Sequence, residues 1–390
     1  MVERDVPASR ADTGTGNRYD RNEWAGAFGD LGTLIPFVVA YIGVLGMDPY
    51  GILLAFGASM LVCGLFYRTP FPVQPMKAIG AVAATQAAQT LTITPGAVHA
   101  AGLVTGLIWF VLGLTGAAGK LARLVGRPVV VGIILGLGMG FMLGGVKMMA
   151  TDWLLGAIGL AGTLLLLGNR SVPAMFLLLL FGALCTVLRD PAVLSGLAAM
   201  AVDFRSPSWA LGSLTLDDIL IGTAFLALPQ LPLTLGNAII AVTEENNRLF
   251  PDRAVTERTV AASTGLMNVV GAALGGVPMC HGAGGMAGHV RFGARTGGAL
   301  VILGAILLAL ALFFSGSVVA LFRIFPPAIL GVILFLTGAQ LALGSCDLSN
   351  NKGERFVTLV TAAFAIWNVG AAFVVGLALL YLHRRGRLSL

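Results

Sequence analysis

One basic side chain, Lys77, lies inside an apolar segment of the chain and could bind an anion directly. Burying a charge in an apolar medium costs at least about 2.5–3.5 kcal/mol, so Lys77 is expected to have a partner. That partner is an anionic substrate, a structural ion pair with Asp30, or water reached by the flexible side chain. Lys77 is therefore the first candidate residue for substrate binding.

The residues before Lys77 predict an extended chain. Pro70, Pro72 and Pro75 lie within six residues, and each lacks an N–H group and disfavours helical geometry in the preceding residue. An extended chain rises about 3.1–3.4 Å per residue, so residues 68–75 span on the order of 22 Å. A helix can then start with Pro75 in its first turn, where its unpaired N–H groups carry a partial positive charge. The candidate binding residues of this stretch are Gln74, Met76, Lys77 and Ala78.

Residues 275–285, Gly-Gly-Val-Pro-Met-Cys-His-Gly-Ala-Gly-Gly, predict a second extended-to-helix junction. The glycines allow a close approach of the backbone, and the helix that follows would open with a positive N-terminus. Two such N-termini facing each other form an anion site made largely of backbone. The candidates here are Cys280, His281, Gly282, Ala283 and Gly284. His281 could instead be a packing histidine.

Polar side chains in two other segments are expected to lie beside this site. Thr33 and Asp30 belong to the segment 24–46, and Gln230 and Asn237 belong to the segment 218–243. Gln230 and Asn237 are seven residues apart and so share one helix face. Their alternative role is hydrogen bonding between helices without substrate contact. Asp30 would repel an anion, so its predicted role is proton coupling or orientation of Lys77.

The composition is that of a membrane protein. Of 390 residues, 57% are hydrophobic and 11% are charged, whereas a soluble protein carries roughly 25% charged residues. Soluble enzymes, nucleic-acid binders and secreted disulfide scaffolds are thereby excluded, and the net charge of +6 is attributed to cytoplasmic loops. The four cysteines form no Cys-x-x-Cys pair, and the chain contains no phosphate-binding Gly-x-x-x-x-Gly-Lys-Ser/Thr loop. We expect no metal, no cofactor and no enzymatic activity.

Hydropathy predicts an all-α protein with fourteen transmembrane segments. If the N-terminus is cytoplasmic and the segments alternate, 19 of the 24 Lys and Arg residues face the cytoplasm and 4 face outward, with Lys77 inside a segment. Both termini are then cytoplasmic, and the stretch 356–383 crosses twice. The predicted segments are 24–46, 50–67, 71–90, 96–118, 128–146, 153–168, 172–188, 218–243, 257–275, 277–290, 297–315, 327–343, 356–368 and 370–383.

An internal repeat relates the two halves of the chain. Residues 127–135 resemble residues 326–334 at an offset of 199, and residues 73–76 match 276–279 at an offset of 203. Seven segments separate the equivalents, so the halves are predicted to lie inverted in the bilayer, as in many secondary transporters. The expected parts are a disordered cytoplasmic N-terminus (1–22), a first repeat (23–188), an extracytoplasmic connector (189–217) and a second repeat (218–384).

Four motifs resemble the molybdate-transporter branch of the sulfate permease (SulP) superfamily. They are Gly-Asp-Leu-Gly-Thr-Leu-Ile-Pro (29–36), Pro-Val-Gln-Pro-Met-Lys-Ala (72–78), Gln-Leu-Pro-Leu-Thr-Leu-Gly-Asn (230–237) and Val-Pro-Met-Cys-His-Gly-Ala-Gly-Gly (277–285). The resemblance implies the fold shared with uracil permease, with an oxyanion held between segments three and ten. It also implies elevator-like movement of a core domain (23–118 and 218–315) against a gate domain (119–188 and 316–384). Many sulfate permeases add a STAS domain, which we do not expect here because the chain stops at Leu390.

The sequence thus predicts a secondary transporter for a small tetrahedral oxyanion, molybdate first and sulfate second. The alternatives are a nucleobase permease on the same fold, a passive anion channel, and a membrane-embedded enzyme. The expected partners are the oxyanion, membrane lipid, a coupling proton or sodium ion, and a second copy of the chain in a homodimer. The expected location is the plasma or inner membrane.

Overall fold

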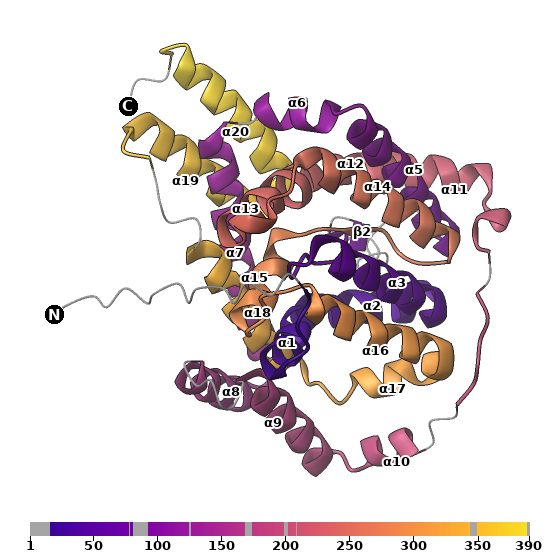
Figure 1. Cartoon of the computed structure of the whole chain (residues 1–390). Helices are drawn as coiled ribbons and strands as arrows, with labels where there is room; N and C mark the ends of the chain where they lie inside the picture. Colours follow the sequence, from indigo (N-terminus) through magenta and orange to yellow (C-terminus); the bar gives the residue numbers. More distant parts are fainter. Residues whose placement is uncertain are drawn as a thin grey trace.

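The chain folds into a bundle of helices around one very short sheet (Figure 1). This computed structural model describes residues 16–77, 79–80, 93–124, 126–167, 174–198, 202–207, 209–343 and 349–387. The sheet consists of two strands of two residues each, and its label β2 lies in the middle of the bundle in Figure 1. The many apolar residues therefore form helices, as the composition predicts.

Helices occupy most of the first half of the described chain. The 3₁₀-helices and π-helices carry the label η. The elements are α1 (Arg21–Ala27), η1 (Phe28–Asp30), α2 (Leu31–Leu45), α3 (Pro49–Tyr67), β1 (Gln74–Pro75), α5 (Pro95–Leu114), α6 (Ala117–Leu124), α7 (Arg127–Met149), α8 (Trp153–Leu166), α9 (Ala174–Arg189) and α10 (Ala192–Ala198).

The second half follows a similar order. Its elements are η3 (Leu211–Ser213), α11 (Leu216–Ile221), η4 (Gly222–Ala227), α12 (Leu228–Leu233), η5 (Thr234–Ala241), α13 (Val242–Leu249), η6 (Pro251–Arg253), α14 (Glu257–Ala273), β2 (Met279–Cys280), α15 (Ala283–Arg291), α16 (Gly298–Phe314), η7 (Ser315–Ser317), α17 (Val318–Phe322), α18 (Pro327–Leu343), α19 (Lys352–Trp367) and α20 (Val369–Arg384).

Four helices of the described chain are long and apolar enough to cross a membrane alone. They are Pro49–Tyr67, Pro95–Thr115, Arg127–Met149 and Gly298–Ser317, and a fifth span results if the bent pair Arg21–Ile35 and Phe37–Gly43 counts as one. Other apolar helices, such as Trp153–Leu166 and Ala174–Arg189, are shorter. The chain is thus a multi-pass membrane protein by length and composition, and the total of fourteen segments stays a prediction.

The final hairpin breaks at Asn368, between α19 and α20. Asn368 adopts an extended conformation (φ −154°, ψ 115°), and its side chain caps α20 by accepting a hydrogen bond from the Ala371 N–H. The stretch 356–383 is therefore two helices rather than one long helix.

Glycines bring the backbones of α7 and α18 into contact. A Cβ built on Gly138 would lie 2.8 Å from the Gly338 carbonyl oxygen, and one on Gly145 would lie 2.6 Å from the Gly331 carbonyl oxygen. The pairs recur after seven residues on both helices, so the close contact extends over two turns. Small residues at helix interfaces are the usual way in which helices associate within a membrane.

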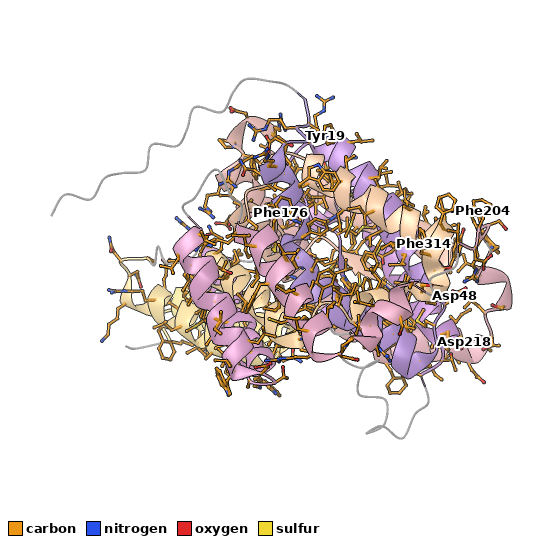
Figure 2. The ribbon with its side chains drawn as sticks, turned by 90° about the horizontal axis from the view of Figure 1, so that it is seen from below. Tyr19, Asp48, Phe176, Phe204, Asp218 and Phe314 are labelled. Carbon is orange, nitrogen blue, oxygen red and sulfur yellow. The ribbon has the colours of Figure 1, made fainter. Side chains whose placement is uncertain are left out.

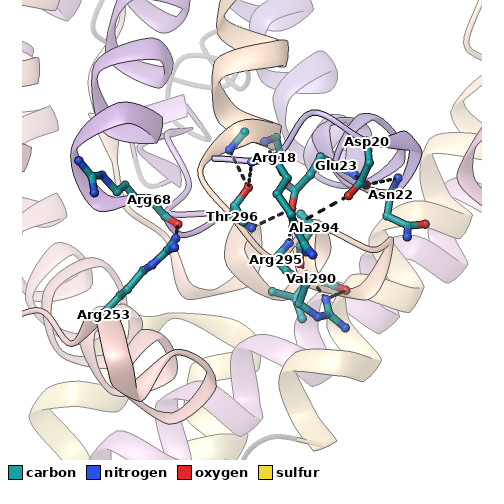
Figure 3. A network of polar contacts seen from close by, with 12 residues as sticks. Arg18, Asp20, Asn22, Glu23, Arg68, Arg253, Val290, Ala294, Arg295 and Thr296 are labelled. Atoms are coloured by element: carbon teal, nitrogen blue, oxygen red, sulfur yellow. Dashed lines mark hydrogen bonds and ion pairs between the residues drawn. The ribbon is translucent and has the colours of Figure 1, made fainter. Parts of the chain in front are cut away.

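The N-terminal residues that the structure describes are packed. Asn17 donates a hydrogen bond to the Gly64 carbonyl (2.9 Å), and Arg18 N–H donates to Thr296 Oγ1 (3.1 Å). Within the N-terminus that was expected to be disordered over 1–22, residues 17 and 18 thus have polar partners on other segments. Residues 1–15 lie outside the described part, and the disorder expected there stays a prediction. Figure 3 shows how buried Glu23 joins α1 to the loop before α16, accepting hydrogen bonds from the N–H groups of Arg295 and Thr296.

The connector between the halves runs along the outside of the bundle (Figure 1). Its residues 203 and 205 donate backbone hydrogen bonds to the carbonyls of Phe313 and Leu312. The Arg205 guanidinium also forms an ion pair with Asp48 (2.6 Å). In Figure 2, Asp48, Phe204, Asp218 and Phe314 lie on one side of the molecule, apart from Tyr19.

Candidate functional site

The two proline-containing stretches meet as an antiparallel pair of strands. Gln74 pairs with Cys280 and Pro75 with Met279, and the Met76 N–H donates to the Pro278 carbonyl (2.8 Å). The predicted extended stretches in the third and tenth segments are confirmed. The helix after β1, however, starts at Lys77, two residues later than predicted, because Pro75 belongs to the strand and the Met76 N–H is used across the pair.

Asn268 of α14 holds the free edge of β2. Its side-chain amide accepts a hydrogen bond from the Met279 N–H (2.8 Å) and donates to the Met279 carbonyl (2.6 Å). Asn268 is buried, and both backbone groups of Met279 are thereby satisfied. Sequence reasoning missed this residue, although an amide within the apolar segment 257–275 was a signal that a buried partner existed.

His281 is held by residues on either side of its ring. Its Nδ1 lies 2.8 Å from the Pro72 carbonyl oxygen, and its Nε2 lies 2.8 Å from Ser263 Oγ. Because a carbonyl only accepts, Nδ1 carries the proton and Nε2 accepts from Ser263. The ring also contacts Tyr67 and Phe71 edge-on. This geometry is that of a packing histidine that joins the two broken segments, the alternative recognised from the sequence.

Asp30, Thr33 and Gln74 form a buried hydrogen-bonded cluster. The Gln74 Nε2 donates to Asp30 Oδ1 (2.7 Å) and to Thr33 Oγ1 (3.0 Å), and the Thr33 hydroxyl also contacts Asp30. The cluster forms because η1 packs directly on α15: a Cβ built on Gly29 would lie 2.4 Å from the Gly288 carbonyl oxygen. Asp30 Oδ2 and Gln74 Oε1 are buried without a hydrogen bond among the described residues.

The ammonium group of Lys77 is buried next to this cluster. Its Nζ makes no hydrogen bond within the described chain, and it lies 3.9 Å from the ring centroid of Phe141 on α7. The chain is helical at residues 77, 79 and 80, and the Gly80 N–H donates to the Met76 carbonyl (2.9 Å). Ala78 lies outside the described residues. Lys77 thus holds a positive charge that the described part of the protein leaves without an anionic hydrogen-bond partner.

The N-terminus of α15 faces the same region. Gly282 is the N-cap residue of α15 and has no side chain to cap the helix. The Gly285 N–H donates to the Gly282 carbonyl (2.9 Å), so the N–H groups of residues 283 and 284 are the ones that a ligand could use. A Cβ built on Gly282 would lie 2.0 Å from Gln74 Oε1, and one on Gly284 would lie 2.3 Å from the Phe141 ring. Only glycine permits these approaches. The start of α15 therefore lies in one region with Gln74 and with Lys77 and its neighbour Phe141.

The remaining predicted residues lie around this convergence. Asn237 is buried, its Oδ1 has no hydrogen bond among the described residues, and its Nδ2 would lie 3.3 Å from a Cβ on Gly282. Gln230 is buried on the same segment and donates to Thr234 Oγ1 (3.0 Å). Met76, Cys280 and Ala283 are buried, with Cys280 Sγ 4.0 Å from the Pro75 carbonyl. Within the described ranges, no three His, Cys, Asp or Glu side chains are grouped to hold a metal ion.

The chain is similar to molybdate transporters over most of its length. The family model described as "Molybdate transporter of MFS superfamily" matches residues 22–141 and 222–341. Molybdate transporter 2 of Arabidopsis thaliana is 33% identical, covering 91% of this chain and 85% of that protein. Molybdate transporter 1 of the same plant is 32% identical (90% and 85%), and molybdate transporter 1 of Chlamydomonas reinhardtii is 29% identical (91% and 90%).

Solved structures resemble the fold. The transmembrane domain of the cyanobacterial bicarbonate transporter BicA has a TM-score of 0.58 at 14% identity, covering 93% of this chain and 99% of that chain. The inward-facing murine Solute Carrier 26 family member A9 anion transporter has a TM-score of 0.64 at 11% identity, covering 95% and 69%. The fold is therefore that of the SulP and Solute Carrier 26 membrane domains, as the sequence motifs implied.

Proposed function

Since this chain belongs to the molybdate transporter family, we propose that it is a secondary active transporter that carries molybdate across the membrane. The chain is a membrane transporter and not an enzyme. The observation that carries the proposal is the buried Lys77 ammonium, which lacks a hydrogen-bond partner in the described structure. A buried unpaired charge is costly, and an oxyanion bound at this position would supply the missing partner.

The anion would be held by backbone and side chains together. The first N–H groups of α15 would donate to the oxyanion, as helix N-termini commonly do. Lys77 supplies the positive charge, and Asn237 Nδ2 lies close enough to Gly282 to donate to the anion. Gln74 would line the site, because its Nε2 already donates to Asp30 and Thr33. Met76, Ala78, Cys280, Ala283 and Gly284 would shape the site, Thr33 and Gln230 would support the amides, and His281 would contribute by fixing the strand pair.

Asp30 is proposed as the coupling residue. Its Oδ1 accepts from Gln74 and its Oδ2 is free of hydrogen bonds in the described structure, so Oδ2 could take up a proton. A proton there would reduce the negative charge beside an incoming anion. The Asp30→Asn variant should transport molybdate with a flattened pH dependence. An Asp30→Asn variant that keeps the wild-type pH profile would remove the coupling role.

Two observations support the proposal that the chain consists of two equivalent halves. The two matched stretches of the family model start 200 residues apart. Helix contacts also occur in symmetric pairs: α3 packs on α16 as α14 packs on α5, and α7 contacts α19 as α18 contacts α8. Such pairing is expected of two equivalent halves related by a two-fold axis. We extend the proposal to fourteen segments in two inverted halves, with core and gate domains that move against each other. Both termini would face the cytoplasm. The protein would be a homodimer in the plasma or inner membrane.

Binding measurements on purified protein test the transported anion. Molybdate should bind more tightly than sulfate, uracil should not bind, and Lys77→Gln should abolish molybdate binding. A matched control is Lys147→Gln, which removes a charge from the last turn of α7 instead of from the site. Tight uracil binding would favour a nucleobase permease, and uptake that does not saturate or respond to an ion gradient would favour a channel. Molybdate binding that is unchanged in Lys77→Gln would refute the site.

A further inference from the structure

Phe141 of α7 contacts both arms of the candidate site. Its ring covers the Lys77 ammonium at 3.9 Å from the centroid. Its ring edge also lies against Gly284, where a Cβ would come within 2.3 Å of Cε2. These two residues belong to different halves of the chain, and Phe141 belongs to neither β1 nor α15. One aromatic side chain of α7 thus contacts both Lys77, which follows β1, and Gly284 of α15.

The contact with Lys77 is a cation–π interaction in a region shielded from water. The negative face of an aromatic ring attracts an ammonium ion, more strongly when the pair is desolvated. Lys77 Nζ has no hydrogen bond among the described residues, so the Phe141 ring is the contact with which a bound anion would compete. The same negative face repels an anion, so the ring and an oxyanion compete for the ammonium.

Phe141 is packed on α18 at its Cβ and is not fully buried. Its Cβ lies against α18, 2.8 Å from where a Cβ on Gly338 would be. The side chain as a whole is only partly buried. Uncovering Lys77 without displacing α7 from α18 would therefore require the ring to rotate about its side-chain bonds, away from its contact with Gly284.

We propose that Phe141 is a gating residue that covers the Lys77 ammonium in the anion-free site and is displaced when the oxyanion binds. This inference rests on the proposed function. Arrival of the anion then breaks a contact between α7 and the first half-helix. Anion binding would thereby alter the packing at the interface between the proposed gate and core domains.

Two replacements at position 141 test the competition. Phe141→Leu removes the aromatic face, and 3,4,5-trifluorophenylalanine at position 141 keeps the shape of the ring but withdraws its negative charge. Both should bind molybdate about 2- to 30-fold more tightly than the wild type, the range that loss of a competing cation–π contact produces. The fluorinated variant retains the packing of Phe141, so it stays informative if the leucine variant does not fold.

Phe335→Leu is the matched control. Phe335 of α18 packs against Gly145 of α7 with its Cβ 2.8 Å from where a Cβ on Gly145 would be, which mirrors the contact of Phe141 with Gly338. The structure gives Phe335 no cation contact within the described ranges. Its replacement should leave the Kd for molybdate unchanged.

The outcomes separate the inference from the proposed function. If the wild type binds molybdate but both variants at position 141 bind it equally or more weakly, the gating role of Phe141 is wrong. The same holds if Phe335→Leu tightens binding as much as Phe141→Leu. If the wild type binds no molybdate at all, the proposed function itself fails.

Discussion

Replacing Gly282 by alanine is a direct test of the geometry at the start of α15. The backbone at Gly282 (φ −79°, ψ 130°) suits any residue, so alanine introduces no backbone strain. Its new Cβ, however, would lie 2.0 Å from Gln74 Oε1. An ordinary contact between these atoms is about 3.4 Å or more, so the Gln74 amide must leave its place.

The magnitude follows from the hydrogen bonds that the displaced amide loses. Gln74 Nε2 donates to the Asp30 carboxylate at 2.7 Å and to Thr33 at 3.0 Å. A bond to a charged group contributes about 1.5–3 kcal/mol and a neutral one about 0.5–1.5 kcal/mol. Loss of both costs about 2–4.5 kcal/mol, which corresponds to roughly 30- to 1,600-fold weaker molybdate binding if the whole cost falls on the bound state.

The assay is the Kd for molybdate of the purified variant, measured together with its Tm. Gly162→Ala on α8 is the matched control, because a Cβ there meets no atom within 4 Å and alanine favours the helix. A Gln74→Ala variant lacks the Gln74 side chain with which the new Cβ would clash. Adding Gly282→Ala to that variant should therefore change the Kd for molybdate very little. Wild-type affinity in Gly282→Ala, or an undiminished effect in that background, would refute the reasoning.

Three further changes probe the frame around the site. Asn268→Ala leaves the buried Met279 N–H and carbonyl without partners and should lower stability by about 2–4 kcal/mol, seen as a lower Tm and reduced uptake; an unchanged Tm would contradict this. Gly145→Val should separate α7 from α18 and abolish uptake, whereas wild-type uptake would show that the close contact is dispensable. A hydrogen bond from Arg189 holds the pKa of Asp152 below its usual value, so this exposed pair persists at neutral pH and is lost as the pH falls through that lowered pKa. Because exposed pairs contribute little, Asp152→Asn should leave uptake and Tm at pH 7 unchanged, and a clear fall in Tm would count against that view.

The sequence alone predicted the broken segments and pointed to the candidate site residues. Proline cannot donate a backbone hydrogen bond, so the stretches around Pro72 and Pro278 had to be extended wherever they lay in the fold. Lys77 was identifiable because a charge within an apolar segment is costly. These are local properties, which composition and spacing reveal without knowledge of the neighbours.

The tertiary structure decided which groups meet. Gln74 pairs with Cys280 across more than 200 residues of chain, and no local period of the sequence encodes that register. Asn268 and Phe141 escaped prediction for the same reason: an amide and an aromatic ring in apolar helices acquire a role only from the backbone or the cation that packing brings to them. His281 was ambiguous until Pro72 and Ser263 were seen on either side of its ring. Local backbone preferences follow from each residue and its neighbours in the chain, whereas the choice of distant partners follows from how the whole bundle packs.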